Sequence, residues 1–210
     1  MENICKKGKN MKVMVVSPHP DDETLGAGGT LLRLKKEGHQ IYWLNITDAK
    51  EKDGWSASFI KQRKEQIQSV CDFFEFDDTF NLKFPPAKLE MLEKSILIQK
   101  IGSSDHKITY ESCISCSKIF RYPYIHRITT MEILSETDFG RIDNPFVPNY
   151  FVNISDYMKS KIQALEIYDT ELGEHPFPRS VDSIKALGTL RGACAGVKYA
   201  EAFRIIKWIE

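Results

Sequence analysis

The chain has 210 residues, 42% of them hydrophobic, and it balances 29 Lys and Arg residues against 29 Asp and Glu residues. This length fits one domain, and the hydrophobic fraction is large enough to build a buried core. The balanced charge provides no net field that would attract a polyanion, so we expect no nucleic-acid partner.

The N-terminal segment, residues 1–10, is polar and rich in lysine, with no apolar stretch behind it. It therefore lacks the pattern of a signal peptide, and we expect a flexible extension followed by a single domain over residues 11–210. No apolar run approaches the length of a membrane span. The five cysteines are odd in number and scattered, which indicates a reducing compartment. We therefore expect a cytoplasmic protein without a membrane span.

The first half of the chain alternates between predicted strands and predicted helices. Short apolar runs that end in loops predict strands, and apolar residues at helical spacing predict helices. The predicted strands are Lys12–Ser17, Gln40–Ile46 and Thr79–Leu82, and the predicted helices are Thr24–Glu37, Ser58–Phe74 and Lys88–Ile101. This alternation is typical of a parallel sheet built from βαβ units.

The second half continues with elements of both kinds. It contains a predicted helix over Tyr110–Phe120, a strand over His126–Leu134, a short strand over Phe151–Ile154, a helix from a cap at Ser155 to about Tyr168, a helix over Ser180–Ala195, and a strand or short helix over Tyr199–Ile209. The whole pattern predicts an α/β fold, a three-layer sandwich with a mostly parallel, Rossmann-like sheet.

The segment His19-Pro20-Asp21-Asp22-Glu23 is the most informative part of the chain, because it follows shortly after the apolar run Val13–Val16. An imidazole and two adjacent carboxylates therefore lie just past the end of a predicted buried strand. In open α/β sheets, ligands bind at the carboxyl ends of strands. Imidazole and carboxylate groups together suit a zinc-type ion. Two neighbouring acids also allow one to bind metal while the other moves protons.

Two other interpretations of this region remain open. The acidic residues could form only a polar turn that caps the next helix, since the helix dipole favours negative charge there. The stretch Gly26-Ala27-Gly28-Gly29 invites a dinucleotide-binding interpretation. However, this stretch lacks the GxGxxG spacing of such sites. A dinucleotide site also needs an acidic residue about 20 positions later, at the end of a second strand, and only Asp48 has that position.

The string from Ser17 to Gly26 resembles the N-terminal signature of the PIG-L/LmbE-like family. These proteins are zinc-dependent de-N-acetylases that act mostly on N-acetylglucosamine-type sugars. Three further stretches also resemble the family: Arg63-Lys64-Glu65, Phe151–Ser155 and Arg191–Phe203. The resemblance implies a hydrolase that removes the N-acetyl group from an aminosugar or its conjugate. It also implies Zn²⁺ or another divalent transition metal as cofactor, and a possible homo-oligomer.

Carried over residue by residue, the resemblance implies that His19 and Asp22 are zinc ligands and that Asp21 is the general base. The segment Ser104-Asp105-His106 looks like the end of the family's second motif, which makes His106 the third ligand. Two histidines and one carboxylate leave an open position for water, as a catalytic zinc site requires. Zinc would then lower the pKa of the water, and Asp21 would accept its proton.

Two further residues are candidates for substrate binding. Arg63 is a plausible donor to sugar hydroxyls or to an anionic substrate group, and the alternative is an exposed helix residue paired with Glu65 or another surface acid. His175 lies in the proline-rich loop Gly173–Pro178, where a rigid surface position favours function. We expect it to line the entrance of the site.

The sequence departs from the family pattern ahead of His106. The second motif normally begins with a histidine, and that position is Ser103, which cannot act as an acid near neutral pH. The family also carries a strand before this motif, whereas Ile101-Gly102 runs directly into Ser103. Either the natural chain has lost a segment here, or residues are missing between Gly102 and Ser103. The alternatives to an active deacetylase are a catalytically weak sugar- or metal-binding relative and a nucleotide-binding Rossmann-like protein.

Overall fold

The computed structural model describes residues 10–86, 105–138 and 145–210. In these ranges the strands are β1 (Lys12–Ser17), β2 (Gln40–Thr47), β3 (Asp78–Phe84), β4 (Arg127–Met131), β5 (Tyr150–Asn153) and β6 (Ala200–Trp208). The helices are α1 (Asp22–Lys36), α2 (Ala57–Phe74), α3 (Asp105–Ser115), α4 (Met158–Ile167) and α5 (Val181–Ala195), with a short 3₁₀ turn at Glu51–Asp53. The predicted helix Lys88–Ile101, the Gly102–Ser103 junction and residues 1–9 lie outside the described residues.

The described strands form two three-stranded sheets. Strands β1, β2 and β3 pair in parallel in that order, with Val15 opposite Trp43 and Trp43 opposite Thr79. Strands β4 and β5 both pair with β6, and both pairs are antiparallel. The α/β class is therefore confirmed, whereas the expectation of a mostly parallel sheet is wrong for the second half of the chain.

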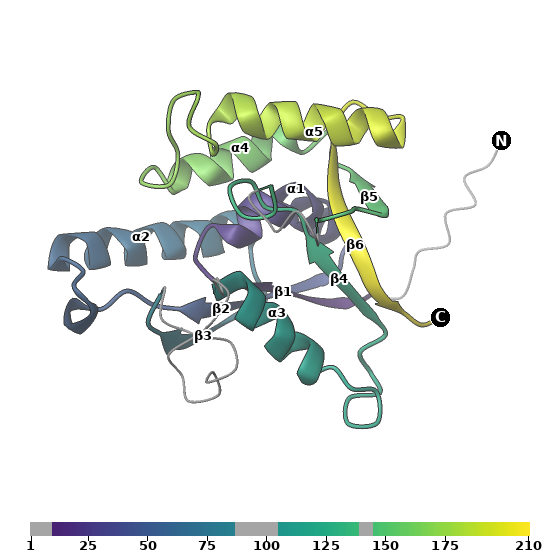
Figure 1. Cartoon of the computed structure of the whole chain (residues 1–210), viewed down its shortest axis with the longest axis horizontal. Helices are drawn as coiled ribbons and strands as arrows, with labels where there is room; N and C mark the ends of the chain where they lie inside the picture. Colours follow the sequence, from purple (N-terminus) through teal and green to yellow (C-terminus); the bar gives the residue numbers. More distant parts are fainter. Residues whose placement is uncertain (1–9, 87–104, 139–144) are drawn as a thin grey trace.

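The two connections explain the two sheet types. A single helix returns the chain to the starting edge of a sheet, so the next strand runs parallel to the first, as between β1 and β2. Between β5 and β6 the chain instead forms two helices, α4 and α5, which contact each other and lie over the same side of the molecule (Figure 1). The second helix reverses the chain once more, so β6 runs antiparallel to β5.

Several predicted boundaries shift in the structure. Helix α3 covers Asp105–Ser115 rather than Tyr110–Phe120. Ser155 does not cap α4, since its hydroxyl donates to Asn153 Oδ1 (2.7 Å) and the helix begins three residues later. The C-terminal segment is a strand. Among the described residues, no helix is both long and apolar enough to cross a membrane.

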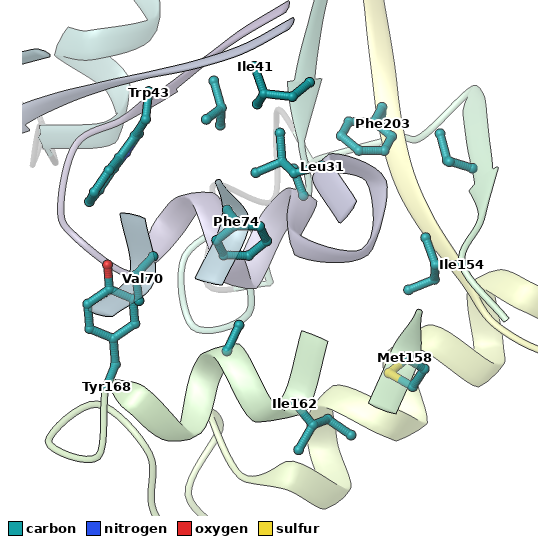
Figure 2. Close-up of a cluster of buried hydrophobic side chains, with 14 residues drawn as sticks. Leu31, Ile41, Trp43, Val70, Phe74, Ile154, Met158, Ile162, Tyr168 and Phe203 are labelled. Carbon is teal, nitrogen blue, oxygen red and sulfur yellow. The ribbon is translucent and has the colours of Figure 1, made fainter. Parts of the chain in front are cut away.

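Helix α1 lies between the parallel sheet and helix α4, and one buried apolar cluster fills the space on both sides of it (Figure 2). Leu31 of α1 faces Ile41 of β2, and Ile162 of α4 lies on the opposite side of the helix. Phe74 of α2 and Phe203 of β6 complete the cluster. The burial of these large side chains fixes α1 against the sheet, and its first residue is thereby fixed as well.

The glycines near the start of α1 allow this close packing. A Cβ atom on Gly26 would lie 2.6 Å from the sulfur of Met131, and one on Gly29 would lie 2.8 Å from Cβ of Ile154. Both glycines are buried inside the helix, so they do not form the exposed phosphate-binding loop of a dinucleotide site. The glycine-rich stretch therefore allows α1 to pack closely against β4 and against the segment after β5.

The loop between β1 and α1 lies at the carboxyl edge of the parallel sheet and carries the His-Pro-Asp-Asp-Glu segment. Thr47 at the end of β2 holds this loop, because its backbone N–H and its hydroxyl both donate to the carbonyl of Pro18 (3.1 and 2.7 Å). Asp21 has a φ of +134°, a strained conformation for a residue other than glycine. Such strain is concentrated at functional sites, where the surrounding structure enforces it.

Candidate metal centre

Three side chains from separate parts of the chain meet at this loop: His19, Asp22 and His106. Their candidate ligand atoms all lie within 4.8 Å of one another. Asp22 Oδ2 is 3.5 Å from His19 Nδ1 and 3.1 Å from His106 Nε2. Ligands about 2.0–2.2 Å from a tetrahedral ion are separated from one another by about 3.3–3.6 Å. The observed spacing is therefore close to what one metal ion requires.

Two atoms of this cluster are buried and have no hydrogen-bond partner: Asp22 Oδ1 and His106 Nε2. A buried polar atom without a partner costs about 1–3 kcal/mol and calls for an explanation. Both atoms belong to side chains that can bind a divalent cation. The residues present therefore fit a metal ion, which would satisfy these atoms.

Each histidine has a carboxylate beside the ring nitrogen that faces away from Asp22. His19 Nε2 is 2.8 Å from Asp105 Oδ2, and His106 Nδ1 is 3.2 Å from Glu136 Oε2. Metal-binding histidines commonly donate their second N–H to a carboxylate, which fixes the ring and makes the ligand nitrogen more basic. The nitrogens left over, His19 Nδ1 and His106 Nε2, are the two nearest Asp22.

The charges of the cluster favour a cation. Burial lowers the pKa of His19, but the hydrogen bonds and charges of Asp105 and Asp22 outweigh burial and raise the pKa to about 10. Burial raises the pKa of Asp22, yet the close approach of His106 and His19 outweighs burial and holds the pKa below its usual range. Protonated His19 offsets only part of the negative charge of the carboxylates, and a bound metal ion would replace that proton.

Asp21, the predicted general base, is buried beside the cluster and forms an ion pair. Its Oδ2 accepts a hydrogen bond from Arg179 Nη1 at 2.6 Å. Burial and the charge of Asp22 raise the pKa of Asp21 well above its usual range, and Arg179 opposes this rise. Arg179 also lies 3.4 Å from Glu136. The arginine therefore links the carboxylate of Asp21 to the acid that holds His106.

Glu23 forms a fully buried hydrogen-bond hub beneath the loop. Its carboxylate accepts hydrogen bonds from the backbone N–H of Asp21 (3.1 Å), the Thr24 hydroxyl (2.7 Å) and the Tyr168 hydroxyl (3.1 Å). Burial raises the pKa of Glu23 to about 7, and the hydrogen bond from Thr24 opposes this rise. These contacts hold the strained backbone at Asp21 from below.

Arg63 is buried, with 8% of its surface exposed. Its Nη1 donates to the carbonyl of Pro20 at 3.2 Å, and its Nη2 contacts Thr170 and Glu171. The interpretation of Arg63 as an exposed helix residue paired with Glu65 is therefore wrong. The guanidinium instead ties α2 and the α4–α5 loop to the residue before Asp21, and its contact with substrate stays a prediction.

His175 is exposed in the loop between α4 and α5. Two residues of this loop reach the site, since Glu171 contacts Arg63 and Arg179 contacts Asp21. His175 therefore lies on a segment that borders the site. Its contact with substrate stays a prediction, as for Arg63.

Sequence reasoning assigned no role to three residues that contact the site: Asp105, Glu136 and Arg179. Asp105 directly precedes His106, so its position beside a ligand was the available signal. Glu136 and Arg179 lie in loops far along the chain from His19. Neither residue belongs to a motif or shows a helical or strand spacing, so only the folded structure places them here.

One family model matches the first half of the chain. Residues 14–109 match the family model of PIG-L, described as GlcNAc-PI de-N-acetylase. This range of the chain is therefore similar to the PIG-L family. The matched range contains His19, Asp21, Asp22 and His106.

Among curated proteins, the chain is similar to the diacetylchitobiose deacetylase of Thermococcus kodakarensis. The two sequences are 24% identical over 227 residues, which cover 94% of this chain and 84% of the deacetylase.

Among solved structures, it is similar to N,N′-diacetylchitobiose deacetylase from Pyrococcus horikoshii, with a TM-score of 0.65, 16% identity, and coverage of 93% of this chain and 84% of that chain. It is also similar to GalB, the 4-carboxy-2-hydroxymuconate hydratase of Pseudomonas putida KT2440, with a TM-score of 0.63, 11% identity, and coverage of 95% and 98%. The same fold thus serves a hydrolase and a hydratase, so function has to be argued from the site.

Proposed function

We propose that this protein is a metal-dependent hydrolase that removes the N-acetyl group from an N-acetylglucosamine-type aminosugar or its conjugate. The observation that carries the proposal is the convergence of His19, Asp22 and His106, with the buried carboxylate of Asp21 directly beside them. The match to the PIG-L family and the similarity to a diacetylchitobiose deacetylase support an N-acetylated sugar as substrate.

Zinc is the metal we propose, held by His19, Asp22 and His106. Two imidazoles and one carboxylate are a common zinc ligand set with a position left for water or substrate, and other divalent transition metals accept the same ligands. When bound, such an ion activates a water molecule and polarises the acetamide carbonyl. Asp105 and Glu136 hold the two imidazoles in the orientation that directs nitrogen toward Asp22.

Asp21 is the residue that we assign to proton transfer. A carboxylate whose pKa is raised by burial is a stronger base than an ordinary carboxylate, and burial and the charge of Asp22 raise the pKa of Asp21 in this way. Asp21 takes one proton from the attacking water, and the amide C–N bond breaks once a proton reaches the leaving nitrogen. Ser103 cannot supply that proton as an acid, so Asp21 passes on the proton that it accepted. Arg179 keeps the Asp21 carboxylate in place.

Arg63 and His175 remain our candidates for substrate contact, at the wall and at the entrance of the site. We also propose that residues 11–210 form one deacetylase domain and that its complete architecture is a three-layer sandwich. A cytoplasmic location and a homo-oligomer are further predictions that follow from composition and from the family resemblance.

Acetate release tests the proposed function. Zinc-loaded protein should release acetate from N,N′-diacetylchitobiose or N-acetylglucosamine, and a chelator should stop the reaction until zinc is added back. Asp21→Asn should keep zinc and lose about 10²–10⁴-fold in kcat, the usual contribution of a general base. Zinc binding without acetate from any N-acetylated sugar would favour the catalytically weak relative. Loss of zinc from Asp21→Asn would show that the roles of the two acids are misassigned.

A further inference from the structure

A column of planar side chains leads from the protein surface to the loop that carries Asp21. Trp55 stacks on Phe59, with ring centroids 4.6 Å apart and ring planes inclined by 20°. The Arg63 guanidinium lies over the Phe59 ring at 5.3 Å from its centroid. Arg63 also donates a hydrogen bond to the carbonyl of Pro20, the residue before Asp21. Each member of the column therefore contacts the next.

Exposure falls steadily along this column. Trp55 is 40% exposed, Phe59 is partly buried and Arg63 is 8% exposed. The three positions are spaced by four residues along α2 and its N-terminal flank, and the separations along the column are 4.6 Å from Trp55 to Phe59 and 5.3 Å from Phe59 to Arg63. The column therefore begins at an exposed side chain and ends beside Asp21, the proposed base.

The column lies at the same end of the molecule as the α4–α5 loop, which borders the site (Figure 1). The β2–α2 loop, which contains Trp55, and the α4–α5 loop, which contains His175, lie at the same end in Figure 1. Helix α2 itself contacts the α4–α5 loop, since Gln62 and Gln66 both donate to Asp169 Oδ1 (3.1 and 2.7 Å). The helix that carries the column is therefore in contact with the loop that borders the site.

Packing at the start of α2 accounts for part of this arrangement. Trp55 precedes the N-cap Ser56, and an apolar residue at this position often packs on the first turn of the helix. That role requires an apolar side chain of adequate size, and leucine meets the requirement. It does not require a large aromatic ring, and the ring of Trp55 stays 40% exposed. The exposed part of this ring is therefore available for contact with a ligand.

Resting on the deacetylase function proposed above, we propose that Trp55 forms a second sugar-binding subsite, which stacks against the ring attached to the N-acetylated sugar. Sugar rings have faces of C–H groups that pack on aromatic rings, and a flat indole offers a large apolar area for such contact. The distance covered by the column is longer than one pyranose ring. The substrate class is accordingly an N-acetylated disaccharide or longer glycan, rather than a free monosaccharide.

Binding of two sugars tests this subsite. Calorimetry would measure zinc-loaded Asp21→Asn protein, in which the substrate stays intact, with N-acetylglucosamine and with N,N′-diacetylchitobiose. Trp55→Leu keeps an apolar residue against the helix and removes the flat ring. It should weaken disaccharide binding about tenfold, the typical loss of one stacking aromatic, and leave monosaccharide binding unchanged.

Trp208→Leu is the matched control. Trp208 is similarly exposed (38%), but it ends β6 on the opposite side of the molecule from the β2–α2 loop (Figure 1). This variant should bind both sugars as the parent does. Equal affinity of the parent for the two sugars, or an unchanged disaccharide affinity in Trp55→Leu, would overturn the subsite. If the wild-type protein released acetate while either result held, the deacetylase proposal would stand and the subsite alone would fall. Absence of binding of either sugar would overturn both.

Discussion

Two groups of buried charged residues contact helix α1, and they are built differently. In the middle of the helix, Lys161 pairs with Glu201 at 2.7 Å and donates to the carbonyl of Leu25, also at 2.7 Å. Glu201 accepts from the backbone N–H groups of Gly29 (2.9 Å) and Thr30 (2.7 Å). The charges of this pair cancel, and both carboxylate oxygens have partners.

The group around Asp22, at the first residue of α1, has neither complete hydrogen bonding nor balanced charge. Asp22 and His106 each keep one buried atom without a hydrogen-bond partner, and carboxylates surround the two imidazoles. A closed, neutral pair holds secondary structure together, whereas an open, negatively charged group needs a cation. The comparison assigns Lys161 and Glu201 to stability and the group around Asp22 to chemistry, and mutations can separate these roles.

The largest expected effect is on metal affinity. His106→Ala should weaken zinc binding by more than about 100-fold, because loss of a ligand costs more than loss of a residue behind a ligand. Titration against a competing chelator would measure this change. His126→Ala removes an exposed imidazole and should leave the affinity unchanged. Equal affinity of wild-type protein and His106→Ala would move the third ligand to another residue.

Next in size is the loss of folding stability in Lys161→Met. The substitution leaves Glu201 buried without its charge partner, which costs about 3–5 kcal/mol. Urea unfolding of the metal-free protein would measure the change, and zinc affinity of the folded fraction should not alter. Lys159→Met on the exposed side of the same helix should cost about 0.5 kcal/mol or less. A similarly small loss in Lys161→Met would remove the structural role of the pair.

Asp105→Asn should have a smaller effect on the metal than His106→Ala. The amide keeps the size of the side chain next to His19 Nε2 but removes the charge that strengthens the histidine as a ligand. Zinc affinity should fall by about 10–100-fold, as measured by the same competition titration. An unchanged affinity would show that the contact with His19 (2.8 Å) does not support the metal.

The smallest expected effect concerns packing beside Glu201. Gly29→Ala should cost about 1–3 kcal/mol by urea unfolding, because its Cβ would lie 2.8 Å from Cβ of Ile154, which cannot move alone. Gly28→Ala should cost less, since its Cβ would lie 3.3 Å from a Thr24 methyl group and alanine favours a helix. Equal effects at both positions would argue against the close approach to Ile154.

The first half of the fold could be predicted from the sequence because its signals are local. The strand Lys12–Ser17 has the predicted bounds, since a short apolar run followed by a polar loop defines it. The direction of β6 could not be predicted in this way. It depends on α4 and α5 packing as a pair before the chain returns, and no single segment contains that information.

The same distinction between local signals and tertiary contacts applies to the residues of the candidate site. The structure brings together His19, Asp22 and His106. The family resemblance nominated these residues, because two of them belong to a motif after a strand end and the third is the last residue of a family-like segment. Arg179 and Glu136 reach the site only through tertiary contacts. Partners that lie more than a hundred residues from the motif leave no periodic or local signal in one sequence.

The most direct test of the account is an X-ray anomalous difference map of crystals grown with zinc, recorded at the zinc absorption edge. The account predicts one strong peak about 2.0–2.2 Å from His19, Asp22 and His106, with no ion at the Lys161–Glu201 pair. A map without a peak among these three side chains, or with zinc held elsewhere, would contradict it.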